Sequence, residues 1–138
     1  MRADTIHALG PLIVAAIAIN LVLAGWAFAA GLTRRRALGP AFWITLLLGL
    51  VLVVVEAGLG ILLAAGGARP RTPLHFLYGV LVAIAAAAQF GLRPGGVLRR
   101  AMQRTAGRPF NEPQVLALLC LTQAALLMRA YMTGALGR

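Results

Sequence analysis

The sequence has one cysteine, three acidic residues and no lysine. With only Cys120, which lies inside an apolar run, the chain has no disulfide framework, no paired-cysteine zinc site and no CxxCH motif for covalent heme attachment. It also contains no Walker loop, no GxGxxG fingerprint, no HExxH helix and no nucleophile–base constellation. These absences argue against hydrolases, nucleotide-binding enzymes and zinc proteins. Polar residues in the apolar runs are too few to line a water-filled channel.

What the chain has in abundance is apolar sequence. Of its 138 residues, 61% are hydrophobic and 12% are charged, and the mean hydropathy is +0.88. Soluble domains carry about 25% charged residues. The composition therefore predicts an integral membrane protein, and 138 residues leave room for a single transmembrane domain that spans the whole chain, residues 1–138.

Four apolar runs have the length of transmembrane helices, each near the ~20 residues that cross the hydrocarbon. The first is too long for a signal-peptide core and is followed by three arginines, so we expect it to be retained. Pro11 inside this run predicts a kink or a late helix start, whereas Thr72 before Pro73 predicts a capped start. We expect an all-α, up-down bundle with Trp26, Phe42 and Trp43 as interface anchors. The predicted helices cover about 6–32, 41–66, 73–92 and 113–135.

All thirteen basic residues are arginines, and twelve of them lie at the ends of the apolar runs. This pattern is typical of membrane topology and argues against nucleic-acid binding. Eight arginines follow the first and third runs, and four lie on the other side. The positive-inside rule then places both termini outside, in a multi-pass protein of a bacterial-type inner membrane.

The two halves of the chain resemble each other. His7 and His75 each open an apolar run, 68 residues apart, and Glu56 and Gln123 lie within the following runs, 67 apart. We expect two parallel two-helix repeats, about 1–67 and 68–138, related by an axis along the membrane normal. The histidines would then face each other at one depth, as the axial ligands of a bis-histidine heme do. The alternative is that both histidines cap helix ends among lipid headgroups.

Other polar residues have two interpretations each. Glu56 either contacts a porphyrin edge or a quinone, or is a structural carboxyl bonded to Asn20, Gln123 or Arg129. Cationic side chains on the outer side are candidate partners of heme propionates, or else solvated charges. Tyr78 either bonds to the site or anchors the interface. The candidate propionate partners are Arg69, Arg71 and Arg129.

Two segments resemble a known family. EAGLGILLAAGGARPRTPLHF, from Glu56 through Phe76 and including His75, resembles the heme A synthase segment in which a glycine-bearing Q-x-x-x-G helix leads to an L-H-F helix. DTIHALGPLIV resembles that family's E-x-x-H-R helix start, although Ala8 replaces the arginine. The resemblance implies b-type heme ligation by His7 and His75, with Asp4 as the catalytic acid. The chain has half the family's usual eight helices.

The sequence therefore predicts a membrane protein that binds b-type heme near its outer face and passes electrons to or from a quinone or another membrane subunit. Two alternatives stay open. The first is a cofactor-free accessory subunit of a larger membrane complex. The second is a half-length oxidase, similar to heme A synthase, that works as a homodimer.

Overall fold

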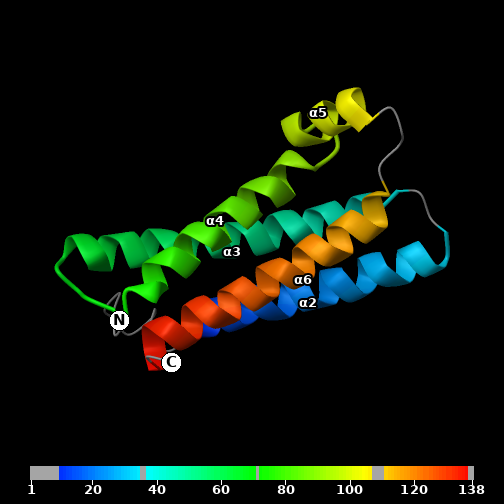
Figure 1. The fold of residues 1–138 in the computed structure, drawn as a ribbon. Helices are drawn as coiled ribbons and strands as arrows, with labels where there is room; N and C mark the ends of the chain where they lie inside the picture. Colours follow the sequence, from blue (N-terminus) through cyan, green and yellow to red (C-terminus); the bar gives the residue numbers. More distant parts are fainter. Residues whose placement is uncertain (1–9, 35–36, 71, 107–110, 137–138) are drawn as a thin grey trace.

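The computed structural model describes residues 10–34, 37–70, 72–106 and 111–136, and their regular structure is entirely helical (Figure 1). This confirms the all-α prediction. The last helix continues directly into a π-helical turn, η1. The elements are α2 (Pro11–Leu32), α3 (Pro40–Ala65), α4 (Leu74–Gly91), α5 (Val97–Ala106), α6 (Glu112–Tyr131) and η1 (Met132–Leu136).

Four of the described helices are long and apolar enough to cross a membrane. They are α2, α3, α4 and the segment Glu112–Gly134, in which α6 runs into the first residues of η1. The prediction of four transmembrane helices in a membrane protein is confirmed. Most predicted helix ends agree with the observed ends within one or two residues. The sequence analysis did not predict α5 or the change to π-helical geometry after Tyr131.

Local chemistry explains where the helices begin. Pro11 occupies the first turn of α2, where its missing N–H costs no hydrogen bond. Residues 6–9 of the predicted helix lie outside the described residues. The preceding Gly10 has a φ of 67°, which a side chain would disfavour. At the start of α6, Asn111 accepts a hydrogen bond from the backbone N–H of Gln114 at 3.3 Å.

Helix α6 lies at the centre of the packing, between α2 and α4, while α3 packs mainly against α2 (Figure 1). Gly10 lies against Tyr131, and Gly31 lies against Pro113. Helices α2 and α6 are therefore antiparallel. We call the end of the bundle where α4 begins the His75 end, and the opposite end, where α5 lies, the α5 end.

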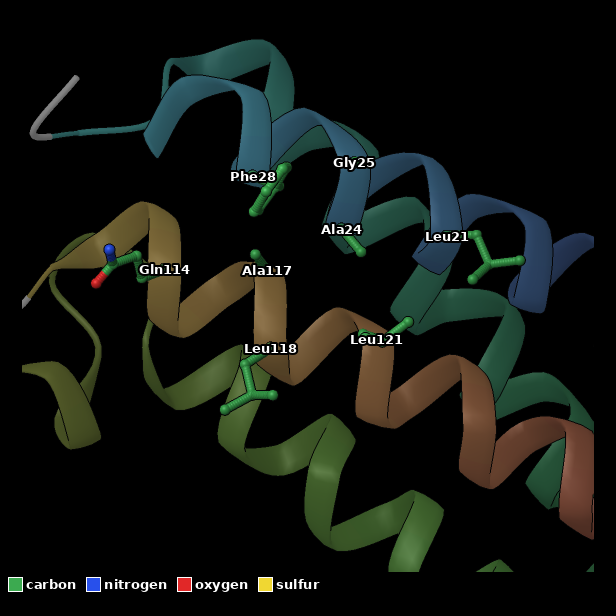
Figure 2. A pocket seen from close by; sticks show the side chains of 8 residues that line it. All are labelled: Leu21, Ala24, Gly25, Phe28, Gln114, Ala117, Leu118 and Leu121. Atoms are coloured by element: carbon green, nitrogen blue, oxygen red, sulfur yellow. The ribbon is translucent and has the colours of Figure 1, made fainter. Parts of the chain in front are cut away.

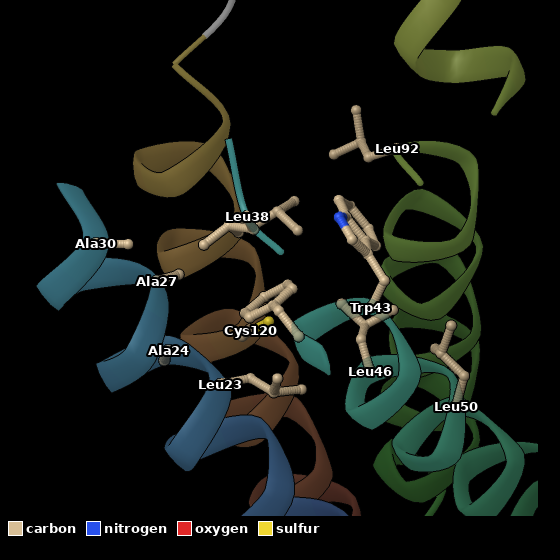
Figure 3. Packing of buried hydrophobic residues seen from close by; sticks show 12 residues of the cluster. Leu23, Ala24, Ala27, Ala30, Leu38, Trp43, Leu46, Leu50, Leu92 and Cys120 are labelled. Atoms are coloured by element: carbon tan, nitrogen blue, oxygen red, sulfur yellow. The ribbon is translucent and has the colours of Figure 1, made fainter. Parts of the chain in front are cut away.

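Two hydrophobic clusters fill the bundle, and the one nearer the α5 end contains the buried aromatic residues Phe42 and Trp43 (Figure 3). Phe42 is fully buried and Trp43 is 7% exposed. The ring of Trp26, which is largely exposed, packs edge-on against Phe42 with centroids 5.8 Å apart. The expectation of three interface anchors was thus wrong for Phe42 and Trp43, because both side chains are buried in the cluster that also contains Leu116 and Cys120.

Helix α3 departs from the bundle toward the His75 end. Glu56 is its last buried residue, and every residue of 57–65 is half-buried or exposed. Its contacts with α4 are correspondingly sparse. The apolar end of α3 is therefore covered by lipid or by another molecule rather than by the described part of this chain.

Candidate functional site

His75 lies in the first turn of α4 and is half-buried against the end of α6. Its Nδ1 is 3.0 Å from the backbone oxygen of Ala130. A carbonyl oxygen only accepts hydrogen bonds, so Nδ1 carries the proton in this arrangement. In the neutral ring, the lone pair is then on Nε2, which is the atom that would bind a metal.

The π-helical turn provides the space for this imidazole. A Cβ atom on Gly134 would lie 2.7 Å from both Cε1 and Nδ1 of His75, a distance that real Cβ contacts do not show. The hydroxyl of Thr133 donates to the carbonyls of Arg129 and Ala130, at 2.9 and 3.1 Å. The Ala130 carbonyl therefore accepts from Thr133 and His75 together, which fixes the ring's orientation.

Arg129 and Tyr78 come together beside His75. The Arg129 guanidinium carbon lies 5.6 Å from the centroid of the Tyr78 ring. Arg129 is exposed and Tyr78 is half-buried, so the cation lies over the aromatic face at the surface of the bundle. Arg69 is exposed in the connection between α3 and α4.

Three predicted site residues, His7, Asp4 and Arg71, lie outside the described residues. The relation between the two histidines is therefore not described. His75, Tyr78 and Arg129 are the predicted site residues that the structure brings together.

Glu56 is buried on α3, with 7% of its surface exposed. Asn20, one of the partners suggested for Glu56, makes two other bonds: its amide donates to the Ala16 carbonyl at 2.9 Å, and its Oδ1 accepts from Gln89 at 2.9 Å. Gln89 also lies 3.5 Å from the sulfur of Cys120. These contacts join α2, α4 and α6 by a buried polar cluster in the middle of the bundle.

Gln123 is the most isolated polar side chain in the described part of the chain. It is fully buried, and neither its Oε1 nor its Nε2 has a hydrogen-bond partner among the described residues. An unpaired buried amide carries a desolvation penalty of roughly 1–3 kcal/mol. Gln123 therefore does not bond to Glu56 as the sequence had suggested.

The sequence analysis missed the most strongly bonded carboxylate, that of Glu112 at the start of α6. It is 2% exposed, and its Oε1 accepts from the backbone N–H of Leu38 at 2.7 Å. Its Oε2 lies 2.5 Å from Nη2 of Arg99 on α5. We call this arrangement the Glu112 clasp. The available signal was an acidic residue after a capping asparagine, downstream of an arginine-rich segment.

The surface between α2 and α6 has an open groove of about 460 Å³ (Figure 2). Its walls are apolar except for Gln114 at one end, and it contains no ionisable side chain. Such a groove suits an acyl chain or a partner helix and has no residue that could ligate iron. The lining residues are Leu21, Ala24, Gly25, Phe28, Gln114, Ala117, Leu118 and Leu121.

Comparison with known proteins gives no relative: no family model, no curated protein and no solved structure matches this chain. Within the described residues, no group of three or more histidine, cysteine, aspartate or glutamate side chains is placed to hold a metal ion. Axial ligation of heme requires only two ligands, because the porphyrin supplies the other four.

Proposed function

We propose that this membrane protein binds one b-type heme at the His75 end, with His7 and His75 as axial ligands. The observation that carries the proposal is the contact between Nδ1 of His75 and the Ala130 carbonyl. Metal-ligating histidines typically donate their second ring N–H to a carbonyl or carboxylate, which fixes the tautomer and the ring orientation. The family resemblance around His75 favours the same role.

Neighbouring residues fit such a group. A Cβ on Gly79 of α4 or on Gly58 of α3 would meet nothing within 4 Å, so neither glycine is needed for contact between helices. Both helices thus have an open surface that a flat macrocycle could approach. The exposed guanidinium of Arg129 is suited to a propionate carboxylate, with Arg69 and Arg71 as further cations and Tyr78 and Glu56 as further candidate contacts.

The topology we propose is an up-down bundle of two parallel two-helix repeats with both termini outside. Arginine counts support this orientation: among the described residues, five arginines lie at the α5 end and two lie at the His75 end, namely Arg69 and Arg129. By the positive-inside rule, the excess at the α5 end supports an inside location for that end. His75 is then near the outer face of a bacterial-type inner membrane.

Heme supplies one-electron redox chemistry when bound. The chain's own residues hold and orient it: His75 is fixed by Ala130, and Arg129 places positive charge beside it. We propose a role in electron transfer to or from a quinone or another membrane subunit. In the heme A synthase-like alternative, a homodimer would use Asp4 as the catalytic acid.

The absorption spectrum of the purified protein tests this function. We expect sharp low-spin b-type bands after reduction with dithionite, and we expect both His7→Ala and His75→Ala to abolish them. Gln123→Leu is the matched control, because it alters a buried residue of α6 outside the site and should leave the bands unchanged. A colourless protein made in cells with ample heme supply would refute the proposal.

A second candidate function rests on the apolar end of α3 beyond Glu56. An accessory subunit of a larger membrane complex would cover this surface with partner helices. Co-purification of stoichiometric partner chains with an unpigmented protein would favour this role. Conversion of heme O to heme A in a host without its own synthase, lost in Asp4→Asn, would identify the oxidase instead.

A further inference from the structure

Helix α5 is held tightly against the end of α4. A Cβ on Gly91 would lie 2.9 Å from the Cβ of Leu98, and a Cβ on Gly96 would lie 2.1 Å from the Gly91 oxygen. Gly95 between them has a φ of 74°. The glycines allow this close approach, and α5 lies just beyond the end of α4 (Figure 1).

The arginines at this end have different roles. Arg99 pairs with Glu112 in the clasp. Arg93 lies over the Phe90 ring, 3.6 Å from its centroid, and donates to the Phe90 carbonyl. The guanidinium groups of both arginines therefore make contacts within this chain.

Arg100 and Arg104 are different, because both are exposed and lie one helical turn apart on the same face of α5. Arg100 uses Nη1 to donate to the Gly95 carbonyl at 2.8 Å, which holds its guanidinium in place and leaves further N–H donors. The two arginines share this open face of α5 with Val97 and Ala101.

The two positive charges and the apolar side chain beside them indicate what this face of α5 binds. Like charges one turn apart repel each other, and among the described residues the acid at this end is Glu112, already paired with Arg99. The arginines therefore favour an anion. Val97 is 69% exposed beside them, which favours an apolar neighbour at the same place. A phospholipid at the membrane interface provides both groups: a phosphate for the arginines and acyl chains for the apolar side chain.

We infer that α5 binds the phosphodiester of an anionic phospholipid in the leaflet at the α5 end. Arg100 and Arg104 donate hydrogen bonds to the phosphate oxygens, and Val97 and Ala101 contact the glycerol and the first acyl carbons. This site is at the opposite end of the bundle from His75 and does not depend on heme binding.

The test uses the full-length protein in nanodiscs of phosphatidylcholine, with phosphatidylglycerol added in increasing fractions and bound lipid counted by native mass spectrometry. An arginine that contacts an anionic headgroup raises the affinity for that lipid about fivefold. We therefore expect Arg100→Gln/Arg104→Gln to lower phosphatidylglycerol affinity about 25-fold. Arg34→Gln removes a charge from the same end but makes no contact with the bound lipid in this proposal, so it should lower the affinity less than twofold.

Three results could overturn the inference. Arg100→Lys/Arg104→Lys keeps both charges, so it should retain most of the affinity; a loss as large as that of the glutamine variant would indicate damage to α5 rather than a lipid site. A loss in Arg34→Gln equal to that in Arg104→Gln would indicate general charge attraction. Displacement of the lipid by inorganic phosphate, but not by chloride of equal ionic strength, would assign the site to the free anion.

Discussion

Removal of the Glu112 carboxylate should destabilise the protein more than any other single change at the α5 end. The carboxylate holds Leu38, which precedes α3, and Arg99 on α5 against the start of α6. Glu112→Ala leaves the buried Leu38 N–H without its acceptor, which costs about 1–3 kcal/mol. It also leaves Arg99 without its anion. Loss of one partner of a fully buried ion pair costs about 3–5 kcal/mol, but Arg99 is 20% exposed, so water offsets part of this.

We therefore expect Glu112→Ala to lower the free energy of unfolding by about 2–4 kcal/mol. Glu112→Gln keeps an acceptor for Leu38 but loses the charge, so its effect should be smaller, about 1–2 kcal/mol. Arg99→Ala should fall between the two, because it leaves a nearly buried carboxylate with one hydrogen bond.

The assay is equilibrium unfolding in mixed micelles with increasing SDS fraction, followed by the fluorescence of Trp26 and Trp43. Arg104→Ala is the control, since it removes a charge from an exposed position of α5 and should change stability by less than about 0.5 kcal/mol. The double variant Glu112→Ala/Arg99→Ala should be less destabilised than the sum of the single variants, with a coupling of about 1–3 kcal/mol. Additive effects, or a Glu112→Ala protein as stable as the control, would refute the clasp.

Three further changes have definite expected outcomes. Gly134→Ala should displace the His75 ring and, if heme binds there, shift or weaken its absorption bands, whereas unchanged bands would separate heme binding from this contact. Gln123→Leu should raise the free energy of unfolding by about 1–3 kcal/mol, and with it the SDS fraction at the midpoint, because it removes an unpaired buried amide; a destabilised variant would mean that the amide has a partner, such as buried water. Gln89→Leu should lower stability by about 1–2 kcal/mol by leaving the Asn20 oxygen unpaired, and Gln89→Leu/Asn20→Leu should recover part of the loss; no recovery in the double variant would contradict this contact.

The four long apolar helices and most of their ends could be predicted from the sequence because they depend on local composition. An apolar run of membrane length forms a helix almost regardless of its neighbours, since unbonded backbone is costly in lipid. Pro11 likewise acts locally, through its own missing N–H. Such features need no knowledge of which helices are neighbours.

Features that depend on helix packing could not be predicted from the sequence. Phe42 and Trp43 are residue types typical of interface anchors, but the packing of the helices buries both in the core. Asn20 had several possible partners, and only the packing of α2 beside α4 places it next to Gln89. The sequence analysis did not predict α5, because a helix of ten residues is too short for a membrane span.

The candidate site was predictable only in part. His75 was identified by its place at the start of an apolar run, and its nearness to Tyr78 follows from helical spacing. Its contact with Ala130 was not predictable, because it depends on the π-helical turn and on Gly134 at the end of another helix. Whether His7 reaches the same site stays a prediction.

The Glu112 clasp implies an order of events during synthesis in the membrane. Leu38 and Arg99 leave the ribosome before Glu112, so the connection before α3 and the helix after α4 lack this contact until the last apolar helix begins to insert. Insertion of α6 then fixes both segments at the α5 end in one step. A chain that stops before residue 112 would keep three apolar helices but leave these two segments loose, and we expect membrane quality-control proteases to recognise it there.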